Sequence, residues 1–526
     1  MANWDERRSR DEAHAGAHLG VLLTVMCLGL ALVIGAASSL SLALPDLAQR
    51  TGATQTELTW VVNSYALVFA GMLLPVGFAA DRYGRRLFLV GGLVVFGVAS
   101  LSSSLVEDPT VIILLRGLAG VGAAAVMPAT LSVLVDAFPA ERRAMAVSVW
   151  AGVSGAGAML GIVVAGVLLE AFSWSSVQLV YGAAGLAAAL ASFLVAPVSR
   201  NVGLAQDPLG GLLSAAGLGG VVYGVIEGPE RGWTDIATVG GLVLGALLLI
   251  AFVVHELRSQ SPMLDVRLFR GRGVSAGSLL IFVQFFAAFG FFFLAPQWLQ
   301  YVRSLSPLES ALWLLPMAVG IAPASRFGPA LLSRLGVRRV ATSGMALMAV
   351  CYAQFAIQAD GEQPMWVFAG TLVLFGAAFG LAITPGTSLI IDGLPEDRRT
   401  LSAAVNDVTR EVGGALGGAI AASVLLAVYE DRLSPATAAL PAPAAAAARD
   451  GVTQALEVST RLGADGQALA SAALSSFSDG YGAALWLAAA VMAVGAVVCA
   501  MLTPPEGSQG RRDRAEQGER EPLRAA

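Results

Sequence analysis

The sequence contains DAFPAERR at residues 136–143 and DGLPEDRR at residues 392–399, an offset of 256 residues. The same offset relates three pairs of glycines: Gly120 and Gly376, Gly157 and Gly413, and Gly161 and Gly417. A nearby offset of 252 relates RYG at 82–84 to RLG at 334–336, and an arginine pair follows each. Chance can supply one such match but not several at nearly one register, so we infer that the chain repeats itself.

Apolar runs occupy most of the chain. Of its 526 residues, 56% are hydrophobic and only 13% are charged, which does not fit the surface of a soluble protein. A bilayer is spanned by about 20 apolar residues in a helix. We therefore predict an all-α membrane protein with 14 transmembrane helices, at residues 20–44, 58–80, 87–106, 110–135, 144–169, 175–196, 208–227, 235–255, 273–302, 308–333, 339–358, 364–391, 402–428 and 480–502.

The repeat divides these spans into two halves. Because the offset joins the fourth span to the twelfth, we predict two parallel six-helix halves that face each other across a central cavity, the architecture of alternating access. The predicted domains are an N-terminal tail (1–19), the first half (20–200), two inserted helices (201–257), the second half (258–502) with an outer loop (429–479), and a C-terminal tail (503–526). Part of the loop can be helical but we assign it no fold, and we expect the charged tail to be disordered.

Arginine sets the orientation. Of the 32 basic residues, 23 fall in the tails and loops that share a side with the N-terminus, and six fall in the opposite loops. The positive-inside rule therefore places both termini in the cytoplasm. All 32 are Arg, and this usage, with the abundance of Ala and Gly, favours a GC-rich bacterial genome and hence the plasma membrane as the location.

The same composition excludes several functions. Without Lys the chain cannot build a P-loop or form a Schiff base. With a net charge of −5 and no basic domain, the chain has no positively charged region that could bind nucleic acid. His14 and His18 lie in a polar tail and His255 at a span end, so we predict neither haem nor a metal site. The three cysteines lie inside apolar runs and are interpreted as packed thiols. No catalytic constellation is present, and we do not expect an enzyme.

Several stretches resemble the major facilitator superfamily, and in particular its fourteen-span branch of drug/proton antiporters. GFAADRYGRR at 77–86 is similar to the signature loop between the second and third spans, and RGLAGVGAA at 116–124 to the fourth-span motif associated with proton coupling. The fifth span, 152–166, resembles the glycine-rich antiporter motif. WVVNSY at 60–65 and AAVNDVTREVGG at 403–414 match the fourteen-span branch. The resemblance covers roughly residues 20–502.

The resemblance implies a cytoplasmic gate and a packed antiporter motif. The gate residues are Gly77, Asp81, Arg82, Gly84, Arg85 and Arg86, whose charges can latch the two halves in the outward-facing state. The alternative is that these arginines only hold the loop inside. The motif glycines are Gly155, Gly157, Gly161 and Gly166, which allow close helix approach and act as a hinge or a seal against proton leak.

The sequence departs from the branch at two positions. Ala36 stands where an acidic residue is usual in the first span, and Ile162 follows Gly161 where Pro is usual. The remaining candidates for proton coupling are Arg116, Asp407, Arg410 and Glu411. A charge as deep as Arg116 must face the cavity or a partner, or else donate to backbone carbonyls. Asp407, Arg410 and Glu411 can cluster on one helix face, either as proton carriers or as an ion network between helices that serves only as a gate.

Aromatic residues suggest where a substrate binds. Phe282, Phe285, Phe286, Phe289 and Phe293 share one helix face near Gln284, either as a cavity wall for flat lipophilic molecules or as a lipid-facing or core stripe. The predicted cavity residues are Trp60, Asn63, Tyr65, Gln284, Phe285 and Phe289.

We therefore expect a secondary active transporter that exports lipophilic, often cationic, small molecules such as drugs and antibiotics in exchange for protons. The proton gradient supplies the energy and no cofactor is expected. Its partners are the substrate, protons and the lipid bilayer; the sequence does not determine the oligomeric state, and we expect a monomer. The alternatives are a dedicated exporter of an endogenous metabolite or self-made antibiotic, uptake by proton symport, and a membrane receptor that does not transport.

Overall fold

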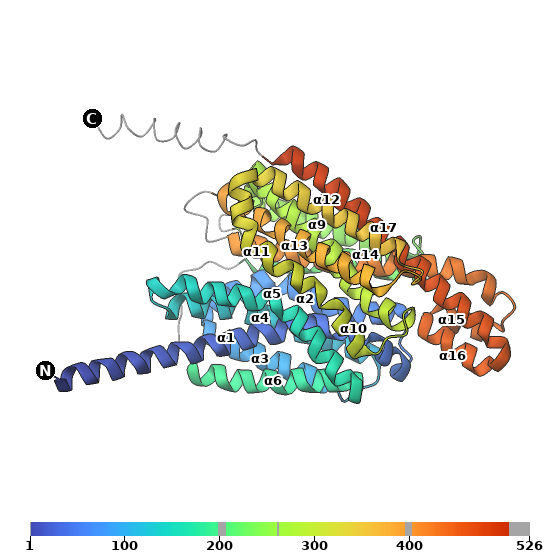
Figure 1. Cartoon of the computed structure of the whole chain (residues 1–526), viewed down its shortest axis with the longest axis horizontal. Helices are drawn as coiled ribbons and strands as arrows, with labels where there is room; N and C mark the ends of the chain where they lie inside the picture. The colour runs from blue at the N-terminus through green and yellow to red at the C-terminus, as the bar shows by residue number, and fades with distance from the viewer. Residues whose placement is uncertain (1, 198–206, 260–261, 263, 395–401, 504–526) are drawn as a thin grey trace.

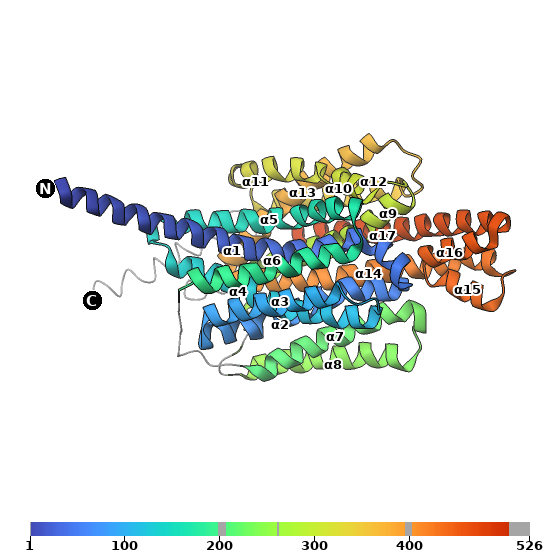
Figure 2. The same ribbon diagram turned by 90° about the horizontal axis from the view of Figure 1, so that it is seen from below.

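The computed structural model of the chain describes residues 2–197, 207–259, 262, 264–394 and 402–503, and it is helical almost throughout (Figures 1 and 2). The side chain of Asp81 and the surroundings of Gly155 are not among its described features, nor are the side chains of His14 and His18. Residues 395–401, which hold most of the second copy of the opening repeat, and the C-terminal tail from residue 504 also lie outside the description.

The helices form two groups and an inserted pair. The first helix group is α1 (Ala2–Thr51), α2 (Gln55–Tyr83), α3 (Arg85–Ser103), α4 (Pro109–Ala137), α5 (Ala140–Ala171) and α6 (Trp174–Val195). The second helix group is α9 (Arg272–Tyr301), α10 (Pro307–Leu314), α11 (Pro316–Leu335), α12 (Val337–Ile357), α13 (Met365–Gly393), α14 (Ser402–Thr437) and α17 (Gln467–Leu502). Between the groups are α7 (Pro208–Arg231), α8 (Ile236–Arg258) and the short helix η1 (Val266–Arg270).

The two groups repeat the same helix pairings. α1 packs on α5 and α2 on α4 in the first group, as α9 packs on α14 and α11 on α13 in the second. Gly161 lies against Gly35 of α1, and its counterpart Gly417 lies against Phe286 of α9. Glycines 252 residues apart end α2 and α11 with positive φ angles, +127° at Gly84 and +80° at Gly336. A left-handed backbone favours Gly at such a turn.

Twelve helices in the described residues are long and apolar enough to cross a membrane, and α5 makes thirteen if its two segments, bent by 43° between Ser154 and Ala156, form one span. That count leaves out α2, which is 29 residues long. The predicted number of fourteen therefore stays a prediction. The predicted span 308–333 contains α10 and α11, which are separated by the single residue Leu315 before Pro316, and the count of twelve takes Pro307–Gly328 as one span.

The helices of three predicted spans extend further than the apolar runs indicate. α1 begins at Ala2, so the predicted tail 1–19 continues the first helix. The predicted loop 429–479 is largely helical: α14 runs on to Thr437, α17 starts at Gln467, and α15 (Ala442–Arg449) and α16 (Val452–Leu462) lie between them. α15 and α16 project at the end of the molecule opposite the termini (Figure 1). A search for apolar runs does not find these segments because they are polar, although their helix propensity is high.

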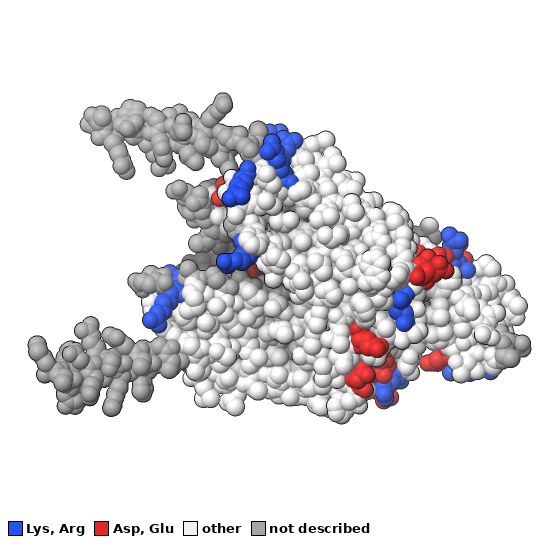
Figure 3. All heavy atoms as spheres, in the orientation of Figure 1, with Lys and Arg blue, Asp and Glu red and all other residues white. Residues whose placement is uncertain are grey.

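The charges on the surface in Figure 3 lie at the two ends of the molecule. On the face shown in Figure 3, Arg residues gather at the end that carries both termini, most of the acidic residues lie at the other end, and a broad uncharged band separates them. Such a band is what contact with hydrocarbon requires.

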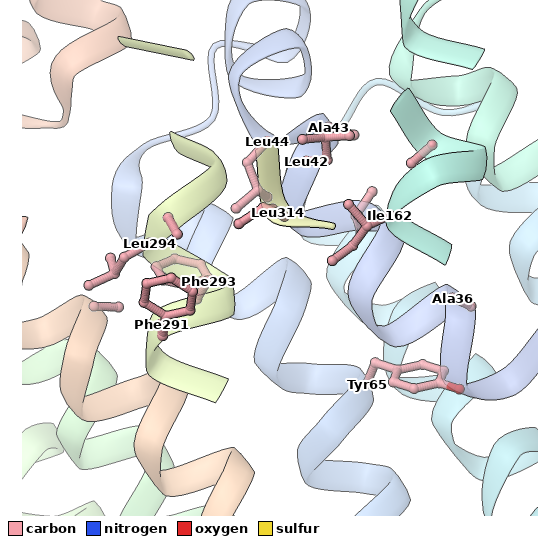
Figure 4. Packing of buried hydrophobic residues seen from close by; sticks show 14 of the residues in the cluster. Ala36, Leu42, Ala43, Leu44, Tyr65, Ile162, Phe291, Phe293, Leu294 and Leu314 are labelled. Carbon is pink, nitrogen blue, oxygen red and sulfur yellow. The ribbon is translucent and has the colours of Figure 1, made fainter. Parts of the chain in front are cut away.

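The two helix groups meet chiefly at the end away from the termini. Gln300 on α9 donates from Nε2 to the Leu42 carbonyl of α1 at 2.9 Å. A Cβ on Gly166 of α5 would lie 2.7 Å from Cβ of Ala311 on α10. Figure 4 shows Leu314 of α10 beside Leu44 of α1 in the same region. The described contacts therefore hold this end of the molecule closed.

Candidate functional site

Three charged residues cluster in the first part of α14 (Ser402–Thr437). Arg410 Nη2 lies 3.0 Å from Glu411 Oε1 and 3.8 Å from Asp407 Oδ1. The Glu411 side chain is only 6% exposed and that of Asp407 24%. The sequence prediction that these three residues share a helix face is therefore confirmed. One guanidinium serves two carboxylates, so the cluster carries a net charge of −1 when both are ionised.

The charged cluster faces both helix groups. Arg410 Nη2 lies 3.4 Å from Met127 Sδ on α4, and its guanidinium carbon lies 5.7 Å from the centre of the Phe285 ring on α9. Met127 is the partner that sequence analysis missed, since a methionine in an apolar run carries no signal of its role. The cluster thus lies at the junction of the two groups, where a change in its charge can alter how they fit together.

Arg116 of α4 is buried in the first helix group and is 1% exposed. Its Nε donates to the Val61 carbonyl of α2 at 3.2 Å, and Nη2 donates to the Ala36 carbonyl of α1 at 3.4 Å. Nη1 has no partner in the described part of the chain. The structure therefore shows backbone hydrogen bonding, one of the two alternatives for Arg116. Ala36, which stands in the place of the usual acid, supplies one of the acceptors.

Tyr65 completes the surroundings of Arg116. Its ring lies beneath the guanidinium, 4.4 Å from the guanidinium carbon, and its hydroxyl donates to the Val33 carbonyl at 2.8 Å. Figure 4 shows Tyr65 beside the segment of α1 that carries Ala36. Tyr65 is fully buried, so it acts here as a packing and hydrogen-bonding residue between α1, α2 and α4.

The other predicted cavity residues divide between packing positions and the charged cluster. Asn63 lies against Gly418 of α14. Gln284 is buried and donates to the Phe379 carbonyl at 2.7 Å, while its Oε1 lacks a described partner.

Phe285 lies beside the Arg410 guanidinium. Its ring centre lies 5.5 Å from that of Phe379 and 6.3 Å from that of Phe289. Phe289 also packs on Gly414. An apolar pocket between α9, α14 and α17, lined by Phe286, Gly417 and Leu485 among others, touches none of the six.

Trp60 points to the inserted pair. Its Nε1 donates to Glu227 Oε1 on α7 at 2.7 Å, and Glu227 Oε2 pairs with Arg231 at 2.5 Å. Sequence analysis did not single out Glu227, although an acid at the end of an apolar run is a usable signal. His255, at the other end of this pair, binds Asp207 through Nε2 at 2.8 Å, which accounts for it without a metal.

The gate residues make contacts within the first helix group. Arg85 pairs with Asp136 of α4, and Arg86 donates to the Phe193 carbonyl of α6 and lies over the Phe193 ring at 4.8 Å. Arg82 lies over the neighbouring Tyr83 ring at 5.5 Å. A Cβ on Gly77 would make ordinary contact with Pro128. The interactions described for Arg82, Arg85 and Arg86 lie within one group, and a latch across the groups stays a prediction.

The antiporter glycines lie at two close helix contacts. Gly157 and Gly161 face α1, where a Cβ on Gly157 would lie 3.3 Å from Ile34 and one on Gly161 would lie 2.6 Å from Cα of Gly35. Gly166 faces α10 of the second group. Gly155 lies outside the description, but α5 bends at that position.

Two parallel sets of helices, a belt without charges and an ion cluster buried between the sets define a membrane transporter. The chain belongs to the Major Facilitator Superfamily, which residues 26–418 match. It is 33% identical to the methyl viologen resistance protein SmvA of Salmonella typhimurium over 470 residues, 88% of this chain and 93% of that protein. It is 31% identical to the multidrug resistance protein Stp of Mycobacterium tuberculosis over 418 residues, 79% of this chain and 78% of that one.

Two further comparisons bear on relatives and on the fold. The tetracenomycin C resistance and export protein of Streptomyces glaucescens is 28% identical over 489 residues, 90% of each chain. A bacterial homologue of the human lysosomal transporter Spinster, solved inward-facing and unoccupied, superimposes with a TM-score of 0.65 over 93% of this chain and 99% of that one, at 16% identity. The structural likeness shows the fold, and the superfamily and the names of the relatives are those of transporters.

Proposed function

We propose that this protein exports lipophilic cations, including drugs and antibiotics, across the bacterial plasma membrane in exchange for protons. The charged cluster of Asp407, Arg410 and Glu411 carries this proposal, because it is the buried ionic group at the junction of the two helix groups. The resistance relatives, one of them named for methyl viologen, support a cationic substrate. The gradient is the energy source, so no cofactor takes part.

The cluster offers one site for which a proton and a cation compete. With both carboxylates ionised, Arg410 balances one negative charge and leaves the other. A cationic substrate supplies the missing charge when it binds from the cytoplasm, and a proton supplies it after release outside. An uncompensated buried charge is costly, so the transporter switches between its inward-facing and outward-facing states only when a cation or a proton is bound to the cluster. That condition couples the two fluxes.

The topology that fits this function has fourteen spans. It comprises the first helix group, the inserted pair α7 and α8, and the second helix group, with α10 and α11 as one span and both termini in the cytoplasm. The arginines at the end that carries the termini support that orientation. The contacts between the groups then close the outer end, and the latch that the gate arginines form between the halves belongs to the state in which the inside is closed.

Transport in inverted membrane vesicles tests this function. Vesicles with an acidic lumen are given methyl viologen or a fluorescent lipophilic cation, with and without a protonophore. We expect accumulation that the protonophore abolishes. Glu411→Gln and Asp407→Asn should each lose proton-driven accumulation while at least one still exchanges labelled for unlabelled cation. Accumulation that is insensitive to protonophore, or proton-driven transport by Asp407→Asn/Glu411→Gln at the level of the parent, would contradict the coupling.

A dedicated exporter of a self-made antibiotic is the second candidate. The Streptomyces relative is described as an export protein for one compound, and the chain covers 90% of it. A panel of cations distinguishes the two functions. Transport of several unrelated cations indicates a multidrug exporter, whereas a folded protein that moves none of them, but protects cells from one natural product, indicates a dedicated one.

A further inference from the structure

The inserted helix α7 lies beside α2 (Figure 2), and its contacts on α2 run from Trp60 to Pro75. Near the end that carries the termini, a Cβ on Gly211 would lie 2.6 Å from Pro75. Midway, a Cβ on Gly71 would lie 3.0 Å from Cβ of Ala215. At the far end Trp60 donates to Glu227 at 2.7 Å. From Gly211 to Glu227 the contact covers about 24 Å of helix at 1.5 Å per residue.

The contact of α7 with α14 is shorter and mostly apolar. Leu218, Val222 and Ile226 of α7 form a buried cluster with Ala70 of α2 and Ala419 of α14. One hydrogen bond crosses to α14, from Ser423 Oγ to the Val225 carbonyl at 2.5 Å. The cluster and the hydrogen bond cover about 12 Å of α7 at the same rise per residue. α7 therefore covers the line along which α2 of the first helix group meets α14 of the second.

The outer side of this pair faces the bilayer. α8 packs on α7 through small residues, with Gly220 against Gly245 and Gly217 against Leu249. Its opposite side carries exposed apolar residues, among them Val243, Leu247 and Ile250. The α7–α8 hairpin thus separates the α2–α14 seam from lipid.

The two contacts cannot both persist if the helix groups rock against each other. We propose that the α7–α8 hairpin is a side wall of the transport path that moves with the first helix group and slides along α14 in every cycle, keeping the α2–α14 seam closed to the lipid. The long contact of α7 with α2 resists sliding, because the hydrogen bond from Trp60 to Glu227 fixes its outer end. We call this hydrogen bond the lock. The apolar contact with α14 can shift because dispersion contacts re-form after a small displacement, whereas the buried Glu227 carboxylate cannot replace the hydrogen bond that it accepts from Trp60. This inference rests on the alternating access of the proposed function.

Two cysteine pairs test the proposal in a parent in which Cys27, Cys351 and Cys499 are replaced by Ala. The first pair, Gly71→Cys with Ala215→Cys, joins α2 to α7, and the second, Val225→Cys with Ser423→Cys, joins α7 to α14. Both are treated with one short bis-methanethiosulfonate reagent, and transport of a lipophilic cation is measured before linking, after linking and after reduction. The unlinked parent tests the proposed function separately, because it must transport before any link is informative.

We expect the α2–α7 link to leave transport within about twofold of the unlinked protein and the α7–α14 link to lower it by at least about tenfold, reversibly on reduction. Inhibition by the first link would overturn the proposal, as would tolerance of the second. If a pair does not fold, single substitutions carry the same test. Ser423→Ala removes the hydrogen bond to the Val225 carbonyl, which sliding breaks in every cycle, so this variant should transport like the parent. Trp60→Phe removes the lock, which is the hydrogen bond to Glu227, so this variant should transport less than the parent. The reverse order would contradict the proposal.

Discussion

The guanidinium carbon of Arg116 lies 4.4 Å from the centre of the Tyr65 ring, in the apolar interior of the first helix group. Arg116 also donates to carbonyls on α1 and α2, and Tyr65 donates to another carbonyl of α1. A planar, permanently charged guanidinium fork directs five N–H donors along fixed directions and can stack flat on a ring, whereas a lysine ammonium is a compact point charge with three donors. Arg116 therefore acts here as a positioning residue that joins three helices.

Arg116→Lys should lower transport by at least about tenfold and lower the melting temperature in detergent, because lysine keeps the charge but loses the fork. Tyr65→Phe is the matched control. It keeps the ring under the guanidinium and loses one hydrogen bond, at a cost of about 1 kcal/mol, so its transport should stay within about twofold. Vesicle uptake and thermal unfolding measure both. Full activity of Arg116→Lys would show that charge alone matters at this position.

Much of the fold could be predicted from the sequence because bilayer thickness sets a fixed length for each apolar run. The 256-residue offset was also informative, since Gly161 and Gly417 lie at equivalent helix contacts in the two groups. The helices of the outer loop could not be predicted in this way. Their residues 442–462 are held by contacts with distant segments, such as the hydrogen bond of Tyr301 to Thr453 at 2.6 Å, which no local pattern records.

Gly161→Ala should disable the transporter. A Cβ there would lie 2.6 Å from Cα of Gly35, so α1 and α5 would have to separate. Gly152→Ala on the same helix is the control, because a Cβ there meets no described atom within 4 Å and alanine favours the helix by up to about 1 kcal/mol. Uptake by reconstituted protein and the passive proton leak of the same liposomes are the measurements. Equal transport by the two variants would show that the contact has room to relax.

Arg410→Ala should be more harmful than its double variant with Glu411→Gln. The single change leaves Glu411, 6% exposed, without its cation, and breaking such a buried pair costs about 3–5 kcal/mol. Neutralising Glu411 in the same chain removes the more deeply buried of the two unpaired charges, so the yield of folded protein should recover in part, whereas proton-driven uptake should not. Size-exclusion profiles and uptake separate the two readouts. Additive losses of folded protein would mean that Arg410 and Glu411 do not act as a pair.

The site was only partly predictable. Asp407, Arg410 and Glu411 could be grouped because residues three and four apart share a helix face. The partners of Trp60 and Tyr65 could not, since the direction in which an aromatic residue points depends on which helix packs beside it. Trp60 reaches Glu227, 167 positions along the chain, only because α7 lies on α2. Sequence patterns thus indicate which residues are polar in an apolar setting, but not the helix that satisfies them.

We expect Asp450 to make the docking of the outer hairpin α15–α16 dependent on pH. Its backbone carbonyl accepts a hydrogen bond from the Gln55 amide of α2 at 2.7 Å, which ties the hairpin to the first helix group. Burial raises the pKa of the Asp450 carboxyl, and the negative charges of Glu230 and Glu57 add to the rise. An acid whose pKa is higher in the docked state takes up a proton on docking, so docking should strengthen as the pH falls through that raised pKa.

Hydrogen exchange of residues 442–462, corrected for the intrinsic effect of pH, should therefore be slower at about pH 5 than at about pH 8. Asp450→Asn keeps the size of the side chain and the backbone acceptor but cannot ionise, so its exchange should be slow at both values. An exporter that releases its substrate into an acidic exterior would then open its outer end less readily as that exterior acidifies. Faster exchange at low pH, or a full pH response in Asp450→Asn, would assign the dependence to another group.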